Sequence, residues 1–166
     1  MKIAPLLMLP LMIGQSYAFD AWGFRSGMSE EQTAAVARRD GYKARRSTTD
    51  TARFHSLWFF RRGANGTDEI GYGASFCDGR LTWVSHDYKA NIGTLFELLS
   101  ELKSSYGAPT VETSSEVRAE GRVRSIDFNF RPRPDDVTEV AAVLSPNTDT
   151  AFGIQVIHHN TEMGCE

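Results

Sequence analysis

The chain has 166 residues, with 18 basic and 21 acidic side chains and a formal net charge of −3. This mild acidity argues against a nucleic-acid-binding protein, because phosphate recognition requires a basic surface. The sequence contains no GxSxG, HExxH, P-loop or dinucleotide-binding motif, so we predict neither a metal nor a cofactor.

Residues 1–18 have the features of a secretory signal peptide. Lys2 precedes an apolar run over residues 3–13, which is too short to span a bilayer and contains two prolines. Ser16 and Ala18 place small residues at positions −3 and −1 of a cleavage site before Phe19. The alternative is a membrane anchor that stays in place. We predict cleavage, and a periplasmic or secreted mature protein without stable membrane insertion.

The remaining residues, 19–166, number roughly 150, a normal size for one domain with its own core. Only two cysteines occur, Cys77 and Cys165. In an oxidising compartment an even number of cysteines indicates a disulfide. A metal site or a nucleophilic thiol is the alternative, although no CxxC motif is present. We predict a Cys77–Cys165 bridge, which requires the C-terminal tail to fold back.

The first predicted element is a helix after Gly27. Ser29 and Gln32 form a capping-box pattern, acidic residues follow the cap, and Gly41 provides a stop. The segment that contains Gly27 therefore indicates a helix start rather than a catalytic loop. Residues 43–53 lack apolar periodicity and are predicted to be a loop.

Three strands are predicted next. "FHSLWFF" is apolar on both alternating faces, and Asn65-Gly66 marks a turn after it. Asp78-Gly79 then supplies a type I′ turn between two alternating runs, a strong hairpin signal.

The Asp78-Gly79 turn predicts the register of this hairpin, and residues that pair across it share a face. The expected pairs are Cys77 with Arg80, Phe76 with Leu81, Ala74 with Trp83, and Tyr72 with Ser85. The predicted core face carries Ile70, Tyr72, Ala74, Phe76, Leu81 and Trp83. The second face is small and mostly polar, and its candidate interaction residues are Gly71, Gly73, Ser75, Arg80, Thr82, Val84 and His86.

Two glycines on this second face allow two interpretations. Glycine inside a strand weakens it unless another group approaches the backbone closely. Gly71 and Gly73 therefore mark either a docking strip for a partner, with Arg80 as an anchor, or a bulge or tight fit beneath a covering segment such as residues 43–53.

The second half of the chain follows the same plan. Thr94 and Glu97 form a second capping-box pattern, leucines follow at helical spacing, and Gly107 ends the helix. Residues 110–117, 122–130, 137–145 and 150–159 then alternate as four strands. We predict an α+β fold with an antiparallel sheet of about seven strands and two helices on one face. The order indicates a possible tandem repeat, residues 19–90 and 91–166.

Two segments carry a family resemblance. "GFRSGMSEEQTAAVARRDGY" and "ASFCDGRLTWVS" resemble the opening helix and the hairpin of the SmpA/OmlA-like domain. The order of helix and meander, in tandem, resembles the β-lactamase inhibitor proteins. The resemblance lies mainly in the first half, and the lipid-attachment cysteine of outer-membrane lipoproteins is missing after the cleavage site. It implies a non-catalytic bacterial envelope domain that binds an unidentified protein.

The histidines suggest an alternative hypothesis for the function. A catalytic or metal-bound histidine needs a carboxylate and a nucleophile or second ligand nearby. His86-Asp87 and His158-His159 are neighbours on strands, so their side chains point to opposite faces. A small hydrolase or ligand-binding domain that uses His86 or His158 is therefore the alternative, and a carboxylate and a hydroxyl beside His86 would favour it.

Overall fold

The computed structural model describes residues 18–48, 51–64, 66–118, 121–144, 152–163 and 165. Its elements in chain order are β1 (Asp20–Ala21), β2 (Phe24–Arg25), α1 (Glu30–Arg39), β3 (Lys43–Arg46), β4 (Phe54–Arg62), β5 (Asp68–Cys77), β6 (Arg80–Tyr88), α2 (Ile92–Tyr106), β7 (Thr110–Arg118), β8 (Gly121–Arg133), β9 (Asp136–Leu144) and β10 (Phe152–Asn160). In this part of the chain no helix is both long and apolar enough to cross a membrane.

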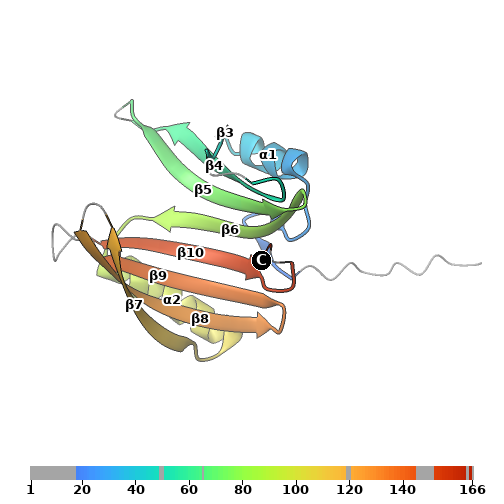
Figure 1. Cartoon of the computed structure of the whole chain (residues 1–166). Coiled ribbons are helices and arrows are strands. Elements are labelled where there is room, and N and C mark those ends of the chain that lie inside the picture. The colour runs from blue at the N-terminus through green and yellow to red at the C-terminus, as the bar shows by residue number, and fades with distance from the viewer. Residues whose placement is uncertain are drawn as a thin grey trace, which may run out of the picture.

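Eight strands form one antiparallel sheet in the order β3-β4-β5-β6-β10-β9-β8-β7 (Figure 1). Each helix is followed by four strands, and the two sets meet where β6 pairs with β10. The prediction of an α+β fold built on an antiparallel sheet is confirmed. The predicted number of strands is one short in this sheet, because residues 43–53 contain the edge strand β3 rather than only a loop. All four β3 side chains are exposed, so no apolar alternation marks this strand.

Helix α1 begins as predicted. The Ser29 hydroxyl accepts a hydrogen bond from the Gln32 amide at 3.2 Å, and the Gln32 side chain accepts one from the Ser29 amide at 2.9 Å. Gly41 follows the helix with φ of 83°. Just before the cap, the Gly27 amide donates to the Leu81 carbonyl at 2.8 Å. The segment around Gly27 thus joins the helix start to β6.

Helix α2 starts one turn earlier than predicted. Its N-cap is Asn91, whose side chain accepts a hydrogen bond from the Thr94 amide at 2.8 Å. The Thr94 hydroxyl in turn accepts from the Asn91 side-chain amide at 2.7 Å. The Thr94–Glu97 pattern is therefore inside the helix. The predicted end at Gly107 is confirmed, with φ of 85°.

Both helices pack on one face of the sheet, which we call the covered face. Next to α1, the buried cluster consists of Phe19, Phe24, Ala37, Tyr42, Leu57, Phe59, Ala74, Phe76, Leu81 and Val84. Next to α2 it consists of Phe130, Val140, Ile154 and Val156. Val84 of the first cluster pairs with His158, two residues along β10 from Val156, so both clusters lie on the same face. We call the other side of the sheet the uncovered face.

The short β1–β2 hairpin was not predicted. Its turn consists of Trp22 and Gly23, with φ of 53° and 82°. The Trp22 side chain packs against both buried clusters. The hairpin therefore fills the space between the two helices on the covered face.

A bulge changes the register of the β5–β6 hairpin. The pairs Cys77–Arg80 and Phe76–Leu81 are as predicted, but the register then shifts between Ser75 and Phe76. Thr82 is the extra residue of β6 and has no cross-strand partner in the register, because a bulge places two residues of one strand opposite one of the other. Trp83 therefore pairs with Ser75. The predicted pairings of Ala74 with Trp83 and of Tyr72 with Ser85 are wrong.

A second bulge lies between β4 and β5. Phe59 pairs with Tyr72 and Phe60 with Ile70, so Gly71 is the extra residue. A Cβ atom at Gly71 would collide with the ring of Tyr42, a member of the buried cluster next to α1. Gly71 thus faces the covered side. Ile70, predicted in the core, is 51% exposed.

Candidate functional site on the uncovered sheet face

Because of the two bulges, the predicted interaction residues do not all lie on the same face of the sheet. Gly73, Ser75 and Thr82 lie on or beside the uncovered face, where Ser75 and Thr82 line a pocket. Gly71, Val84 and His86 belong to the covered face, and Val84 is fully buried in the cluster next to α1. The Arg80 guanidinium donates to the Gly27 carbonyl at 3.2 Å, which holds it against the segment before α1. The predicted set is therefore not one continuous strip.

Gly73 lies beneath two tryptophans. A Cβ atom there would be 2.9 Å from Cζ3 of Trp58, its cross-strand partner in β4, and 3.0 Å from Cζ3 of Trp83, a diagonal neighbour in β6. It would also be 2.9 Å from the Ser85 hydroxyl. The strip over Gly73 is therefore occupied by side chains. The tight-fit interpretation explains this glycine, and the covering groups are indole rings rather than residues 43–53.

Sequence reasoning missed Trp58 and Trp83 as surface residues. Both indoles are partly exposed on the uncovered face. A tryptophan on each strand that flanks a glycine is a usable signal, since glycine lets large rings approach the backbone. The signal was hidden because the simple hairpin register placed Trp83 on the core face.

A depression of about 580 Å³ adjoins Trp83 on this face. Its lining residues come from four strands and the C-terminal tail, and are Phe54, Ser75, Thr82, Trp83, His159, Thr161 and Cys165. We call it the tail pocket. Aromatic walls with a few hydroxyl groups and one imidazole are typical of sites that hold an apolar group and orient it by hydrogen bonds.

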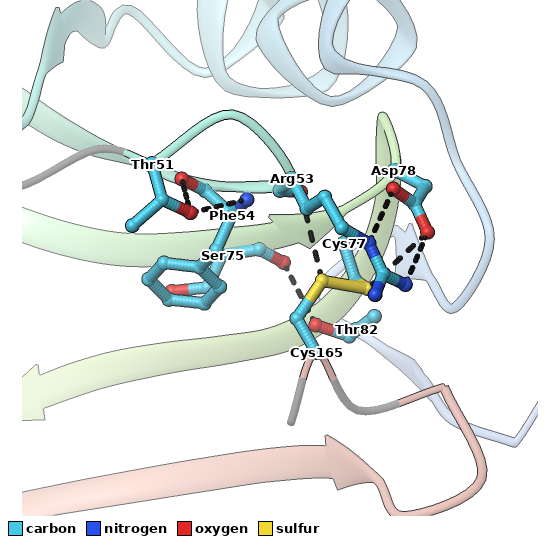
Figure 2. The surroundings of a disulfide bond; sticks show 8 residues. All are labelled: Thr51, Arg53, Phe54, Ser75, Cys77, Asp78, Thr82 and Cys165. Atoms are coloured by element: carbon cyan, nitrogen blue, oxygen red, sulfur yellow. Dashed lines mark hydrogen bonds and ion pairs between the residues drawn. A yellow bond between two sulfur atoms is a disulfide. The ribbon is translucent and has the colours of Figure 1, made fainter.

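The Cys77–Cys165 disulfide brings the tail to this pocket (Figure 2). The two Cα atoms are 5.5 Å apart, and the bridge links positions 88 residues apart. The predicted disulfide and the folded-back tail are thus present in the structure. Within the described residues, the only group of metal-ligand type is Cys77, Asp78 and Cys165. Its sulfur atoms are bonded to each other, so they are not thiolate ligands.

An ion pair lies beside the disulfide. The Arg53 guanidinium donates to both carboxylate oxygens of Asp78, at 3.1 and 2.8 Å (Figure 2). These hydrogen bonds lower the pKa of Asp78. The Cys165 sulfur lies 3.6 Å from the Arg53 carbonyl oxygen. The segment before β4, the β5–β6 turn and the tail therefore meet at one point.

The two ends of the uncovered face differ in charge. Near β3, the Arg45 guanidinium lies over the Phe60 ring, 4.6 Å from its centre. Near β7, Glu139 lies close to Asp127 and Glu112. Burial raises the pKa of Glu139, and the two neighbouring carboxylates raise it further. Arg45 is also paired with Asp68 at 3.2 Å, so the charge near β3 is balanced, whereas the three carboxylates near β7 make that end of the face acidic.

His86 has no catalytic arrangement among the described residues. Its Nδ1 contacts the Gly71 carbonyl, and its ring packs on Tyr72 and Tyr88, with centroids 4.5 and 4.6 Å away. The adjacent Asp87 points to the uncovered face, where it accepts a hydrogen bond from Gln155 at 2.9 Å. The carboxylate and hydroxyl that would favour an enzyme are not beside His86 in this part of the chain.

His158 is closed off from solvent. Its Nδ1 is 3.0 Å from the Thr138 hydroxyl, and the two side chains are 8% and 0% exposed. Burial lowers the pKa of His158 to about 4, so the imidazole is neutral at physiological pH. This pair resembles a nucleophile and a base in composition, but a substrate has no access to it.

Comparison with models of known protein families, with curated proteins and with solved structures gave no match. The feature that stands out is the uncovered face, with two tryptophans, the tail pocket and an acidic end.

Proposed function

We propose that the protein is an exported, non-catalytic domain that binds another protein through the uncovered face of its sheet. The observation that carries this proposal is the placement of both helices and the β1–β2 hairpin on one side, which leaves the partly exposed Trp58 and Trp83 on the other. Exposed aromatic groups gathered beside a pocket are typical of protein-interaction sites.

The bound partner supplies an apolar or aromatic side chain to the tail pocket. Phe54 and Trp83 form its aromatic walls. Ser75 and Thr82 also line it, with hydroxyls that already bond to the Ser56 hydroxyl and the Ser75 carbonyl but keep lone pairs that accept a further hydrogen bond. Tryptophan is among the residues that most often dominate binding energy. Trp83 is therefore the predicted anchor of the interface, in place of Arg80.

Substitution of Trp83 tests this proposal. We expect Trp83→Ala to weaken partner binding at least about tenfold, because an interface anchor contributes more than 1 kcal/mol. Phe96→Ala is the matched control, since Phe96 is 65% exposed on α2 and lies on the opposite side of the sheet. The partner is first captured from envelope extract and identified by mass spectrometry, and its affinity for each variant is then measured with purified proteins.

Circular dichroism and thermal melting confirm that each variant is folded. Trp58→Ala is a second variant on the same face, in case Trp83→Ala does not fold. Equal affinity of the wild type and of a folded uncovered-face variant, or an equal loss for Phe96→Ala, would show that the binding site lies elsewhere.

A further inference from the structure

Asp136 is a buried carboxylate with an unpaired oxygen. The residue is 5% exposed, and its Oδ1 has no hydrogen-bond partner among the described residues. Burial raises its pKa to about 6, although the nearby Arg133 partly offsets this. A buried charged group is stable only when it is paired, because desolvation costs several kcal/mol. Asp136 therefore has one buried carboxylate oxygen that is available to a further charged donor.

The N-terminal segment lies at the same end of the covered face. Asp136 begins β9 and pairs with Asn160 at the end of β10. His158, two residues back along β10, lies on the same face, and its ring is 6.2 Å from the Phe19 ring. Phe19 and Asp136 are therefore neighbours of the same short stretch of β10.

The predicted cleavage site falls inside this buried region. Ala18 and Phe19 are 3% and 1% exposed, and the Ala18 amide donates to the Ser26 hydroxyl at 2.7 Å. The Phe19 carbonyl accepts from the Ser26 amide at 3.1 Å, which fixes the position of Phe19. A peptidase cannot reach a bond buried in this way, so any cleavage here precedes folding.

We propose that a leader peptidase hydrolyses the Ala18–Phe19 bond before folding, and that the new α-ammonium of Phe19 pairs with the buried carboxylate of Asp136. Water adds across the peptide bond, the Ala18 carboxylate leaves with the leader, and the Phe19 amine takes up a proton. Among the buried polar residues of the described chain, Asp136 is the only one with a carboxylate. The Ser26 hydroxyl, which no longer receives the Ala18 amide, is a second acceptor for the ammonium.

Two matched forms of the protein test this pairing. The first is exported with its own leader and begins at Phe19. The second keeps Ala18 behind a Gly-Ser remnant, so that the Phe19 nitrogen remains an uncharged amide, as in the structure. Each form is compared with its own Asp136→Asn variant, and Asp135→Asn on the adjacent turn is the control.

We expect Asp136→Asn to lower the Tm of the form that begins at Phe19 by at least about 6 °C, since the variant leaves a buried ammonium unpaired. In the extended form the same substitution leaves Tm unchanged or raises it, because it removes an unpaired carboxylate. Asp135→Asn changes neither form by more than about 2 °C. An equal effect of Asp136→Asn in both forms would overturn the pairing.

A second measurement needs no substitution. Intact mass and N-terminal sequencing of the exported protein should show Phe19 as the first residue. Its α-amine should react with an acylating reagent at least about tenfold more slowly in the folded than in the unfolded protein, because a paired and buried amine is not a free nucleophile. A different first residue, or an α-amine that reacts equally fast in both states, contradicts the proposal.

Discussion

The two halves of the sheet share one order of elements but are packed differently. Helix α1 buries Thr33 and Ala37, and the cluster that it joins has ten buried hydrophobic residues in the described chain. Helix α2 has no fully buried residue, and its cluster has four in the described chain. The leucines of α2 are only partly buried, and Phe96 and Ile92 are 65% and 60% exposed.

The N-terminal segment accounts for much of this difference. Phe19 and Phe24 belong to the first cluster, and small residues on α1 let that helix approach a layer of aromatic side chains from the sheet. Equivalent topology therefore does not imply equivalent stability. We infer that the first half contributes more of the free energy of unfolding, and three predictions test this comparison.

The largest expected effect is truncation of a core ring in the first half. Phe59 is 0% exposed, so Phe59→Ala should lower the free energy of unfolding by about 3–5 kcal/mol. Leu98 on α2 is partly buried, and Leu98→Ala should cost only about 1–2 kcal/mol. Urea denaturation followed by circular dichroism measures both. Similar losses for the two variants would mean that the halves are equally well packed.

The disulfide should have the next largest effect. Replacing both Cys77 and Cys165 by serine removes a link between positions 88 residues apart. We expect a loss of roughly 2–4 kcal/mol, because the unfolded chain gains conformational entropy. Denaturation of the wild type with and without a reductant should reproduce the loss, and the double-serine variant should not respond to reductant. An unchanged midpoint in both experiments would show that the tail adds no stability to the first half.

The helix caps should show the smallest difference. Ser29 takes part in two reciprocal hydrogen bonds with Gln32, so Ser29→Ala should cost about 1 kcal/mol. Asn91→Ala removes the cap of a helix that is less well packed, and should cost about 0.5 kcal/mol in global stability. Thermal melts of the two variants in one buffer provide the comparison. A larger loss for Asn91→Ala would reverse the proposed ranking of the halves.

Two local signals were predicted well from the sequence, whereas the start of α2 at Thr94 was predicted one turn too late. The Ser29–Gln32 capping box and the Asp78-Gly79 turn depend on residues within one turn of each other, and both are confirmed, with φ of 47° and 74° in the turn. Edge strand β3 was missed because an exposed strand needs no apolar pattern. The Trp22-Gly23 turn was missed because a positive φ is rare for a bulky residue.

The candidate site was predicted less well, since it depends on two bulges. The register error at Thr82 moved Trp83 to the wrong face and placed Val84 among surface residues. A bulge inserts one extra residue into one strand, and the turn residues at the end of the hairpin do not mark where it occurs. Gly73 and Ser75 were placed on the correct face because the extra residue lies in β6, so the alternation of faces along this part of β5 is unchanged.

The pairing of β6 with β10 also has a consequence for the folding of the chain. Strand β6 completes the first set of four strands, yet its second neighbour is the last strand of the chain. A chain that emerges from its N-terminus must therefore hold β6 as an open edge until residues 152–160 arrive, and long-range pairing of this kind is slow. The closure of the centre of the sheet and the position of the tail at the Cys77–Cys165 bond therefore both depend on the last strand of the chain.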